Sequence, residues 1–260
     1  LPLVPDKCAL RCASGHSFDR AREGYCNLLL VHQKATLHPG DNPEMVAARR
    51  KFLEAGYYRP LAERLLAMVR VASPSCLLDA GCGEGYYLGQ LRSALPGLPL
   101  AGTDISRAAI KAAAKKHKGI PFAVASNKQL PFAPQSMGAI LSLFGFPAWE
   151  GFKKVLSADG RVVLVDPGPD HLLELREQIY AEVKRTEVVS LDEAFSSGFI
   201  LEAEEKMDFR FHLPSQEAIQ DLLAMTPHGY RMGQAGKERV GKLDGLEVRA
   251  SVVIRTLGLR

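Results

Sequence analysis

From residue 76 onward, the sequence alternates short apolar segments with amphipathic segments of helical period. This alternation is typical of a mostly parallel sheet whose strands are joined by right-handed helical crossovers. We expect seven strands, at residues 76–80, 98–103, 121–125, 139–143, 161–166, 199–213 and 247–256. Helices are expected at residues 86–94, 106–117, 149–156, 171–185 and 215–225. Residues 73–260 should therefore form one α/β domain around a seven-stranded sheet.

Two shorter segments precede this domain. Residues 41–72 predict a helical hairpin, in which Asp41 is the expected N-cap, Pro43 takes the first helical position and Glu44 completes a capping box. Residues 1–40 are rich in Cys, His, Gly and Pro, sustain no period, and are too short to bury a core of their own. We therefore expect a separate N-terminal Cys/His module.

The composition places the chain among globular proteins. Its 260 residues are 47% hydrophobic and 24% charged, which is enough for a sizeable core and too apolar for a disordered chain. The longest apolar stretch has about half of the roughly 20 residues that a membrane-spanning helix needs. Five cysteines are an odd number and no secretory leader opens the sequence, so a secreted disulfide framework is not expected. We expect a cytoplasmic protein with no membrane partner.

Positive charge is concentrated in the first two thirds of the chain. Residues 1–170 hold 21 basic and 14 acidic residues, whereas residues 171–260 hold 12 basic and 15 acidic residues. Lys and Arg release counterions when they bind phosphates, so this asymmetry favours a polyanionic partner. Solvated helix faces would give the same counts. The charge alone therefore leaves both interpretations open.

The segment with the most chemical information follows the first predicted strand. That strand ends near Asp79, and Gly81, Gly83 and Gly85 form a turn before the helix at residues 86–94. Glycines let a backbone approach a ligand without an intervening Cβ, and a helix N-terminus offers unpaired N–H groups. The spacing differs from the dinucleotide fingerprint, and a carboxylate at its start would repel a pyrophosphate. The loop therefore favours a ligand with a cationic group.

Two further strand ends add polar groups to the same edge of the sheet. Asp104 closes the second strand, where a carboxylate can accept both hydroxyls of a ribose. Ser126 and Asn127 follow the third strand and suit the edge of an adenine. An amino-acid moiety at the glycines, a ribose and a base together describe S-adenosylmethionine. These features resemble the class I S-adenosylmethionine-dependent methyltransferase fold, and a Rossmann-like domain with coincidental glycines is the alternative.

Motifs along nearly the whole chain resemble one methyltransferase family. They are Cys12-x-x-x-His16-Ser17-Phe18-Asp19, Glu23-Gly24-Tyr25-x-Asn27, Ala48-Arg49-Arg50-x-Phe52-Leu53-x-Ala55-Gly56-x-Tyr58, Asp79-x-Gly81-Cys82-Gly83-Glu84-Gly85, Leu130-Pro131-Phe132, Pro167-Gly168-Pro169-x-His171 and Met225-Thr226-Pro227. In this order they resemble the bacterial 23S rRNA (guanine-N1) methyltransferases of the RlmA type. The resemblance implies a seven-stranded, Rossmann-like methyltransferase domain preceded by a small zinc-ribbon-like module.

The resemblance also implies further cofactor-binding residues. Gly83 and Glu84 would form the loop, and Tyr58 and His171 would reach S-adenosylmethionine from flanking segments. His171 follows the carboxyl end of the fifth predicted strand, which is the end where open α/β sheets bind their ligands. The alternative for Tyr58 is a buried core aromatic, and the alternative for His171 is an N-cap or first-turn residue of a helix.

The same family carries an N-terminal zinc site made of two ligand pairs. Cys12 and His16 match the second pair, while the first pair has no counterpart in this sequence. Structural zinc takes four ligands, and Cys8 would supply at most a third. We therefore expect zinc only if further ligands lie upstream of Leu1, and otherwise an incomplete site in an RNA-binding module.

The resemblance implies that the chain transfers a methyl group from S-adenosylmethionine to N1 of a guanine in a 23S rRNA hairpin. The proton on guanine N1 has to leave, and Asp166, at the end of the fifth strand, is the candidate general base. Trp149 could stack on a flipped base or pack in the core. A small-molecule methyltransferase and a catalytically silent RNA-binding protein are the alternative functions, and a homodimer is left open.

Overall fold

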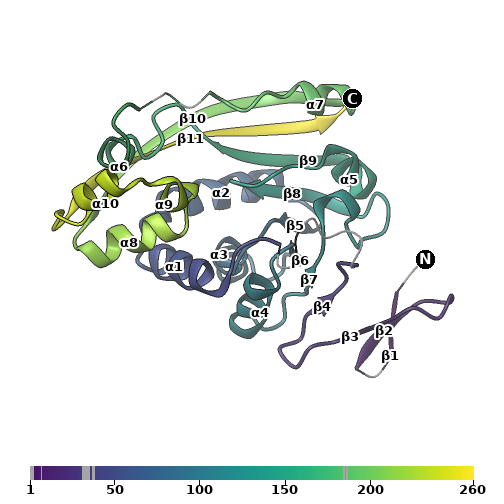
Figure 1. The fold of residues 1–260 in the computed structure, drawn as a ribbon. Helices are drawn as coiled ribbons and strands as arrows, with labels where there is room; N and C mark the ends of the chain where they lie inside the picture. The colour runs from purple at the N-terminus through teal and green to yellow at the C-terminus, as the bar shows by residue number, and fades with distance from the viewer. Residues whose placement is uncertain (1–2, 7, 31–35, 37–38, 184, 186) are drawn as a thin grey trace.

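An eight-stranded sheet forms the centre of the computed structural model, which describes residues 3–6, 8–30, 36, 39–183, 185 and 187–260. The strand order is β10-β11-β9-β8-β5-β6-β7-β4 (Figure 1). The strands are β4 (Cys26–Asn27), β5 (Leu77–Ala80), β6 (Leu100–Asp104), β7 (Phe122–Val124), β8 (Met137–Leu143), β9 (Leu156–Pro167), β10 (Phe199–Leu213) and β11 (Leu246–Leu259). Neighbouring strands from β4 to β9 are parallel, whereas β11 runs antiparallel to both β9 and β10. All seven predicted strands are present, and β4 is an eighth at the edge.

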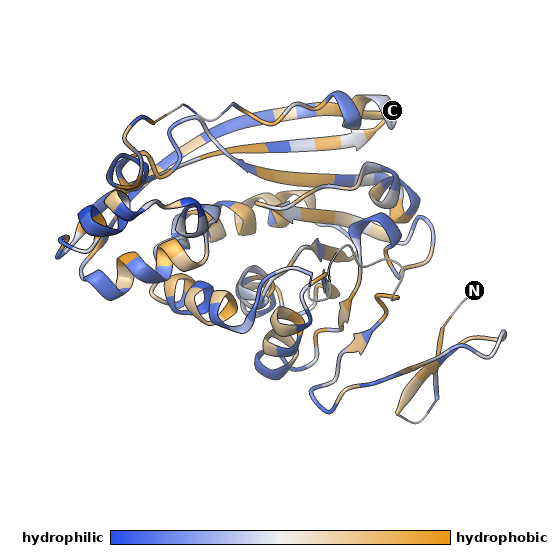
Figure 2. Ribbon diagram, in the orientation of Figure 1, coloured by the Kyte–Doolittle hydropathy of each residue, from blue (hydrophilic) through white to orange (hydrophobic). Residues whose placement is uncertain are grey.

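Helices cover both faces of this sheet. Those that bury apolar side chains on one face are α1 (Pro43–Glu54), α2 (Arg59–Ala72), α3 (Tyr86–Ala94), α4 (Arg107–Lys116), α6 (Leu173–Ile179), α8 (Gln216–Ala224) and α10 (Gln234–Val240). The other face is covered by α5 (Trp149–Val155) and α7 (Asp192–Ser196). Alternation along β9 shows the two faces, because Val163 and Val165 join the first core and Val162 and Leu164 join the second. Figure 2 shows the result as apolar central strands between helices that are apolar along one side.

The start of α1 differs from the predicted capping box. Asn42 is the N-cap, and its side chain accepts a hydrogen bond from the backbone N–H of Met45 at 2.9 Å. Pro43 takes the first helical position, as expected. Asp41 has another role, since its carboxylate forms an ion pair with Arg49 and its carbonyl accepts from the Ser106 hydroxyl at 2.6 Å. The prediction of Asp41 as the cap is therefore wrong by one residue.

The helix predicted at residues 171–185 is much shorter in the structure. It is α6, which begins after the left-handed residue Leu172 and ends at Ile179. Its last carbonyls accept from the guanidinium of Arg239 on α10, at 2.9 Å for Gln178 and 3.1 Å for Ile179. If the helix continued, these carbonyls would accept from backbone N–H groups of the next turn. Instead they accept from the side chain of a residue about 60 positions away. The short helices α7, α9 (Pro227–Arg231) and α10 were not predicted.

The N-terminal segment contains regular structure rather than the irregular chain suggested by its missing period. Strands β1 (Val4–Asp6), β2 (Ala9–Arg11) and β3 (Ser17–Asp19) form an antiparallel sheet beside the main body (Figure 1). β4 then pairs in parallel with β7, so the chain joins the large sheet before the predicted helical hairpin begins. In the described part of the chain, no helix is long and apolar enough to cross a membrane.

Candidate cofactor site

The glycine loop between β5 and α3 is fixed by the neighbouring strand. Gly81, Gly83 and Gly85 have φ values of 103°, 56° and 82°, a region that favours glycine. Asp104, at the end of β6, accepts from the backbone N–H of Gly83 at 2.9 Å and from that of Ser106 at 2.7 Å. Asp104 therefore braces the loop with both oxygens. Each oxygen keeps a further lone pair for a ligand hydroxyl, so its predicted contact with a ribose stays a prediction.

Asp79 is the least satisfied group at this loop. Its side chain is 1% exposed, and neither carboxylate oxygen has a hydrogen-bond partner among the described residues. Burial, and then the charge of Asp104, raises the pKa of Asp79 to about 8. A buried carboxylate without a donor is costly, so this position calls for a cationic ligand group. The α-ammonium of S-adenosylmethionine is such a group, and the described residues therefore fit this cofactor.

Ser126 and Asn127 connect the ends of three strands. Asn127 begins a short 3-10 turn, η2 (Asn127–Gln129), after β7, and Ser126 is its N-cap. The Asn127 amide donates to the carbonyl of Ala80 at 3.4 Å and to that of Phe146 at 3.2 Å. The Ser126 hydroxyl accepts from the backbone N–H of Lys128 at 3.3 Å. The structure thus ties Asn127 to the start of the glycine loop, while the contact of Ser126 and Asn127 with an adenine stays a prediction.

Tyr58 and His171 meet although 113 residues separate them. The Tyr58 hydroxyl lies 3.2 Å from Nε2 of His171, and Nδ1 of His171 lies 2.7 Å from the carbonyl of Ser251. A carbonyl only accepts, so Nδ1 carries the proton and Nε2 accepts from the hydroxyl. Burial lowers the pKa of His171 to about 4, which keeps the ring neutral, and burial raises the pKa of Tyr58. His171 is not a helix cap, because Leu172 takes that position.

Ser251 could not be predicted from the sequence, because a backbone acceptor can come from any residue type. Its carbonyl nevertheless fixes which ring nitrogen of His171 carries the proton. Both ring nitrogens of His171 are engaged in the structure. A hydrogen bond from His171 to the cofactor would therefore require one of these bonds to change.

An aromatic wall, formed by Tyr58, Phe144, His171 and Phe209, stands beyond the carboxyl end of β8. The Phe144 ring centroid lies 6.0 Å from that of Tyr58 and 5.6 Å from that of His171, and Phe209 lies 5.6 Å from Tyr58. Phe144 adopts a left-handed conformation with φ of 53° and is 38% exposed. Two residues further on, Phe146 is 92% exposed. Tyr58 and His171 are buried, so the exposed rings of Phe144 and Phe146 are the flat apolar surface offered to an aromatic substrate.

Asp166 does not join these residues. By strand alternation it lies on the opposite face of β9 from Val163 and Val165, which share a core with Tyr58. Its Oδ2 lies 3.5 Å from Nη1 of Arg255, and burial raises its pKa to about 6 while Arg255 opposes that change. On the same face, Trp149 packs against Phe152 and Phe199 at centroid distances of 6.0 and 5.1 Å. Trp149 is therefore a core residue and not a base-stacking one.

Comparison with known proteins decides the family. The model for the RlmA N-terminal zinc ribbon matches residues 1–37, and a methyltransferase domain model matches residues 77–163. The 23S rRNA (guanine(748)-N(1))-methyltransferase of Streptomyces fradiae is 30% identical over 259 residues, which are 96% of this chain and 91% of that protein. The chain belongs to the family of RlmA-type 23S rRNA (guanine-N1) methyltransferases. Like the family, it is an S-adenosylmethionine-dependent methyltransferase by its domain and its glycine loop.

Other relatives agree with this assignment. A putative 23S rRNA (guanine-N(1)-)-methyltransferase of Bacillus subtilis is 30% identical and aligns over 88% of this chain and 82% of its own length. One from Micromonospora griseorubida is 35% identical over 66% of this chain and 63% of its own length. A solved Haloferax volcanii complex, between the Trm112 methyltransferase activator and a putative methyltransferase, matches with a TM-score of 0.53 and 20% identity over 82% of this chain and 93% of that chain. That likeness shows the fold alone.

The family's zinc module is present only as a partial ligand set. Sγ of Cys12 lies 3.2 Å from Nδ1 of His16, and this hydrogen bond lowers the pKa of the Cys12 thiol. Among the described residues, no group of three or more His, Cys, Asp or Glu side chains could hold a metal ion. Because structural zinc needs four ligands, this pair alone does not fit the metal.

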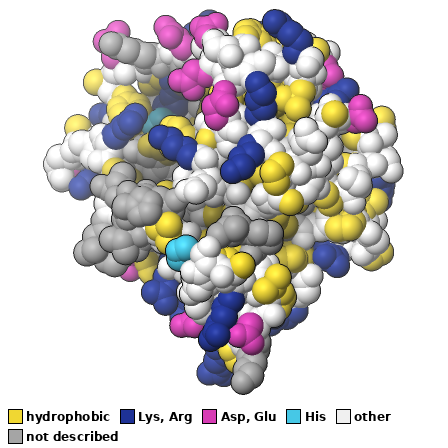
Figure 3. Space-filling model, turned by 90° about the vertical axis from the view of Figure 1, so that its right-hand side faces the viewer, with side chains coloured by type: hydrophobic (Ala, Val, Ile, Leu, Met, Phe, Trp, Pro, Cys, Tyr) yellow, Lys and Arg dark blue, Asp and Glu magenta, His cyan; other side chains and the backbone are white. Residues whose placement is uncertain are grey.

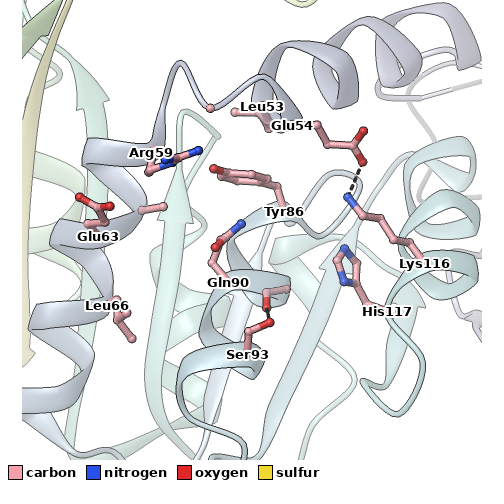
Figure 4. A pocket seen from close by; sticks show the side chains of 13 residues that line it. Leu53, Glu54, Arg59, Glu63, Leu66, Tyr86, Gln90, Ser93, Lys116 and His117 are labelled. Carbon is pink, nitrogen blue, oxygen red and sulfur yellow. Dashed lines mark hydrogen bonds and ion pairs between the residues drawn. The ribbon is translucent and has the colours of Figure 1, made fainter.

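A cavity of about 490 Å³ lies on the outer side of α3, between the α1–α2 turn and the end of α4 (Figure 4). Lys116 projects into it, donates to Glu54 at 2.7 Å and lies 3.9 Å from Glu84 at the back of the glycine loop. Both Glu84 oxygens are buried without a hydrogen-bond partner in the described part of the chain. None of the described residues that line the cavity is a cofactor residue expected in this family. The cavity is therefore distinct from the candidate cofactor site.

Proposed function

We propose that this chain methylates N1 of a guanine in a hairpin of 23S rRNA. The unpartnered carboxylate of Asp79 at the glycine loop is the observation that supports the cofactor half of the proposal. Two relatives named for guanine-N1 methylation, which align over most of their own lengths, support the substrate half. The candidate cofactor site and the aromatic wall lie at the same edge of the sheet, because the parallel strands β5, β6 and β8 all end there.

The residues of the site would mainly hold and orient the two reactants. S-adenosylmethionine supplies a methyl group that its sulfonium makes electrophilic. Asp79 would receive the ammonium, Asp104 the ribose hydroxyls, and Ser126 and Asn127 the adenine edge, so the cofactor lies along the strand ends. Holding donor and acceptor in line accounts for several kcal/mol of a methyl-transfer barrier, about 7–11 kcal/mol at best. The proposed task of the chain is therefore positioning.

The target guanine would lie against the aromatic wall. Stacking of a base on an aromatic side chain contributes about 1–3 kcal/mol and needs no particular base. Phe146 is the exposed ring nearest to this wall along the chain, and the Asn127 amide holds its backbone carbonyl. Asp166, the base expected from the sequence, lies on the opposite face of β9 from this wall and pairs with Arg255, so we assign it a structural role rather than removal of the N1 proton.

The charge distribution supports a nucleic-acid substrate. On the face that includes the N-terminal sheet, Lys and Arg side chains are spread from top to bottom, and most of the acidic side chains lie in the upper half (Figure 3). Phosphate binding by such side chains would position an RNA hairpin between the N-terminal module and the strand ends. Sedimentation velocity with and without RNA tests whether the chain forms a homodimer.

Transfer of label from tritiated S-adenosylmethionine to 23S rRNA that lacks this modification tests the proposal. After digestion to nucleosides, the label is expected in 1-methylguanosine. An Asp79→Asn variant serves as the matched control and should transfer little label. Label in a different nucleoside, or none with a folded protein that binds the cofactor, would refute the guanine-N1 assignment. Label in small molecules of an RNA-free extract would instead support the small-molecule alternative.

A further inference from the structure

The amino-acid end of the cofactor presents an electrostatic problem at this site. Asp79, Glu84 and Asp104 all lie at the glycine loop, and burial raises the pKa of each. These carboxylates suit the ammonium and the sulfonium of S-adenosylmethionine. The same molecule also carries an α-carboxylate next to the ammonium, which these three groups would repel. A cation on the open side of the loop would offset this repulsion.

A guanidinium reaches that side from α1. A Cβ placed on Gly83 would lie 3.7 Å from Nη1 of Arg49 and 3.9 Å from its Cδ, so Arg49 covers the middle glycine of the loop. The Arg49 side chain is 27% exposed. Lys116 lies near Glu84 as well, but it pairs with Glu54 and lines the outer cavity. Arg49 therefore lies close enough to Gly83 to bind a ligand carboxylate there.

The position of Arg49 is held by contacts from two other segments. Its Nη1 forms an ion pair with Asp41, and its Nη2 donates to the carbonyl of Met225 at 3.3 Å. Asp41 is itself tied to the turn after β6 through the Ser106 hydroxyl. Gly40, with φ of 78°, packs so closely that a Cβ there would lie 2.8 Å from that of Ser106. The segment before α1 is thus anchored beside Asp104, and it aims the guanidinium across the loop.

We propose that Arg49 receives the α-carboxylate of S-adenosylmethionine, and that Asp41 is the positioning residue that keeps its guanidinium over Gly83. This inference rests on the proposed function, since it takes S-adenosylmethionine as the cofactor. The two charged groups of the cofactor would then have separate partners at the loop. Asp79 would bind the ammonium, and Arg49 would bind the carboxylate. A planar guanidinium suits a carboxylate because it can donate two parallel hydrogen bonds.

A comparison of two ligands on matched variants tests the proposal. Calorimetry measures the affinity of the wild type, Arg49→Gln, Arg49→Lys and Arg50→Gln for S-adenosylmethionine and for its decarboxylated analogue. Arg50, the exposed neighbour on α1, is the control for a general loss of charge. Arg49→Gln should weaken S-adenosylmethionine binding about 10- to 100-fold, the range for a hydrogen bond between charged groups. It should change the affinity for the decarboxylated analogue less than about 3-fold, and Arg50→Gln should change neither affinity.

The remaining measurements separate the possible failures. Arg49→Lys should recover part of the lost affinity, and Asp41→Asn should weaken binding of the carboxylated ligand more than that of its analogue. Equal losses for both ligands in a folded Arg49→Gln protein would overturn the proposal, because Arg49 would then only support the loop. Equal affinity of the wild type for the two ligands would also overturn it and leave the proposed function intact. Failure of the wild type to bind S-adenosylmethionine at all would instead overturn the proposed function.

Discussion

Replacement of Asp79 by Asn should raise the stability of the cofactor-free protein and lower its affinity for the cofactor. The Asp79 carboxylate is buried without a partner, and burial raises its pKa from 3.8 to about 8. Its pKa in the folded state is thus above that in the unfolded state. The stability associated with the protonated group is present below pH 4 and is lost as the pH rises towards 8. Asn lacks this titration and stays neutral at every pH.

The magnitude follows from the difference between the two pKa values. One pKa unit corresponds to about 1.4 kcal/mol, so the wild type should lose at most about 5 kcal/mol between pH 4 and pH 8 through this group. Denaturant unfolding of both proteins across this range gives the difference directly. The stability of Asp79→Asn relative to the wild type should therefore rise with pH. Parallel pH profiles of the two proteins would refute the idea that Asp79 is an uncompensated buried acid.

Proton release on cofactor binding provides an independent measurement. If the ligand ammonium requires the ionised form of Asp79, binding at pH 7 should release about 0.9 proton, and binding at pH 8 about 0.5 proton. Calorimetry in buffers with different ionisation enthalpies counts these protons, with S-adenosylhomocysteine as a stable ligand that keeps the ammonium. Asp79→Asn should bind more weakly and release no proton through this site. An unchanged proton count in the variant would assign the release to another group.

Four further outcomes are expected. His171→Asn should cost about 1–3 kcal/mol of unfolding free energy and weaken cofactor binding, because it leaves buried hydrogen-bonding groups unpaired; a wild-type melting temperature and affinity would contradict this. Phe146→Ala should change stability by less than about 0.5 kcal/mol, yet lower kcat/KM on RNA by about tenfold or more with cofactor affinity unchanged, and an unaltered kcat/KM would exclude a stacking role. Asp166→Asn should not lower stability at pH 7, because burial raises the pKa of Asp166 to about 6 and Arg255 keeps its ion pair with Glu204, and it should leave kcat largely intact; a large loss of kcat in the folded variant would make Asp166 the base. The 260-residue chain, desalted after loading with zinc, should hold well under one equivalent, since Cys12 and His16 supply two ligands; a full equivalent resistant to His16→Ala would show a different site.

The order of strands and helices was predictable because it depends on local patterns. Five predicted strands lie within a few residues of their observed bounds, and the helix at residues 86–94 is α3 without change. The glycine loop was predictable for a related reason, since positive φ angles at Gly81, Gly83 and Gly85 restrict the residue type at each position. The family was also evident in the sequence, because its motifs recur in order along the chain.

The partners of the site residues could not be predicted in this way. Asp104 was expected to face a ribose, and the structure shows that it also accepts two backbone N–H groups of neighbouring turns. Asp166 was predicted to be the general base because it lies at a strand end. Alternation along β9 instead places its side chain on the opposite face of the sheet, where it pairs with Arg255. Such contacts depend on how the turns and strands lie in space, and a sequence pattern does not record that arrangement.

The sequence by itself determined the fold class, the glycine loop and the family of this protein. These features follow from side-chain periodicity and from backbone angles, which each residue imposes on its own neighbourhood. The tertiary structure decided that Tyr58 donates to His171, that the Ser251 carbonyl sets the tautomer of His171, and that Arg49 covers Gly83. Each of these contacts joins segments far apart in the chain, and the Ser251 carbonyl is a backbone group that every residue carries. Only packing of the whole chain selects which of those identical groups meet.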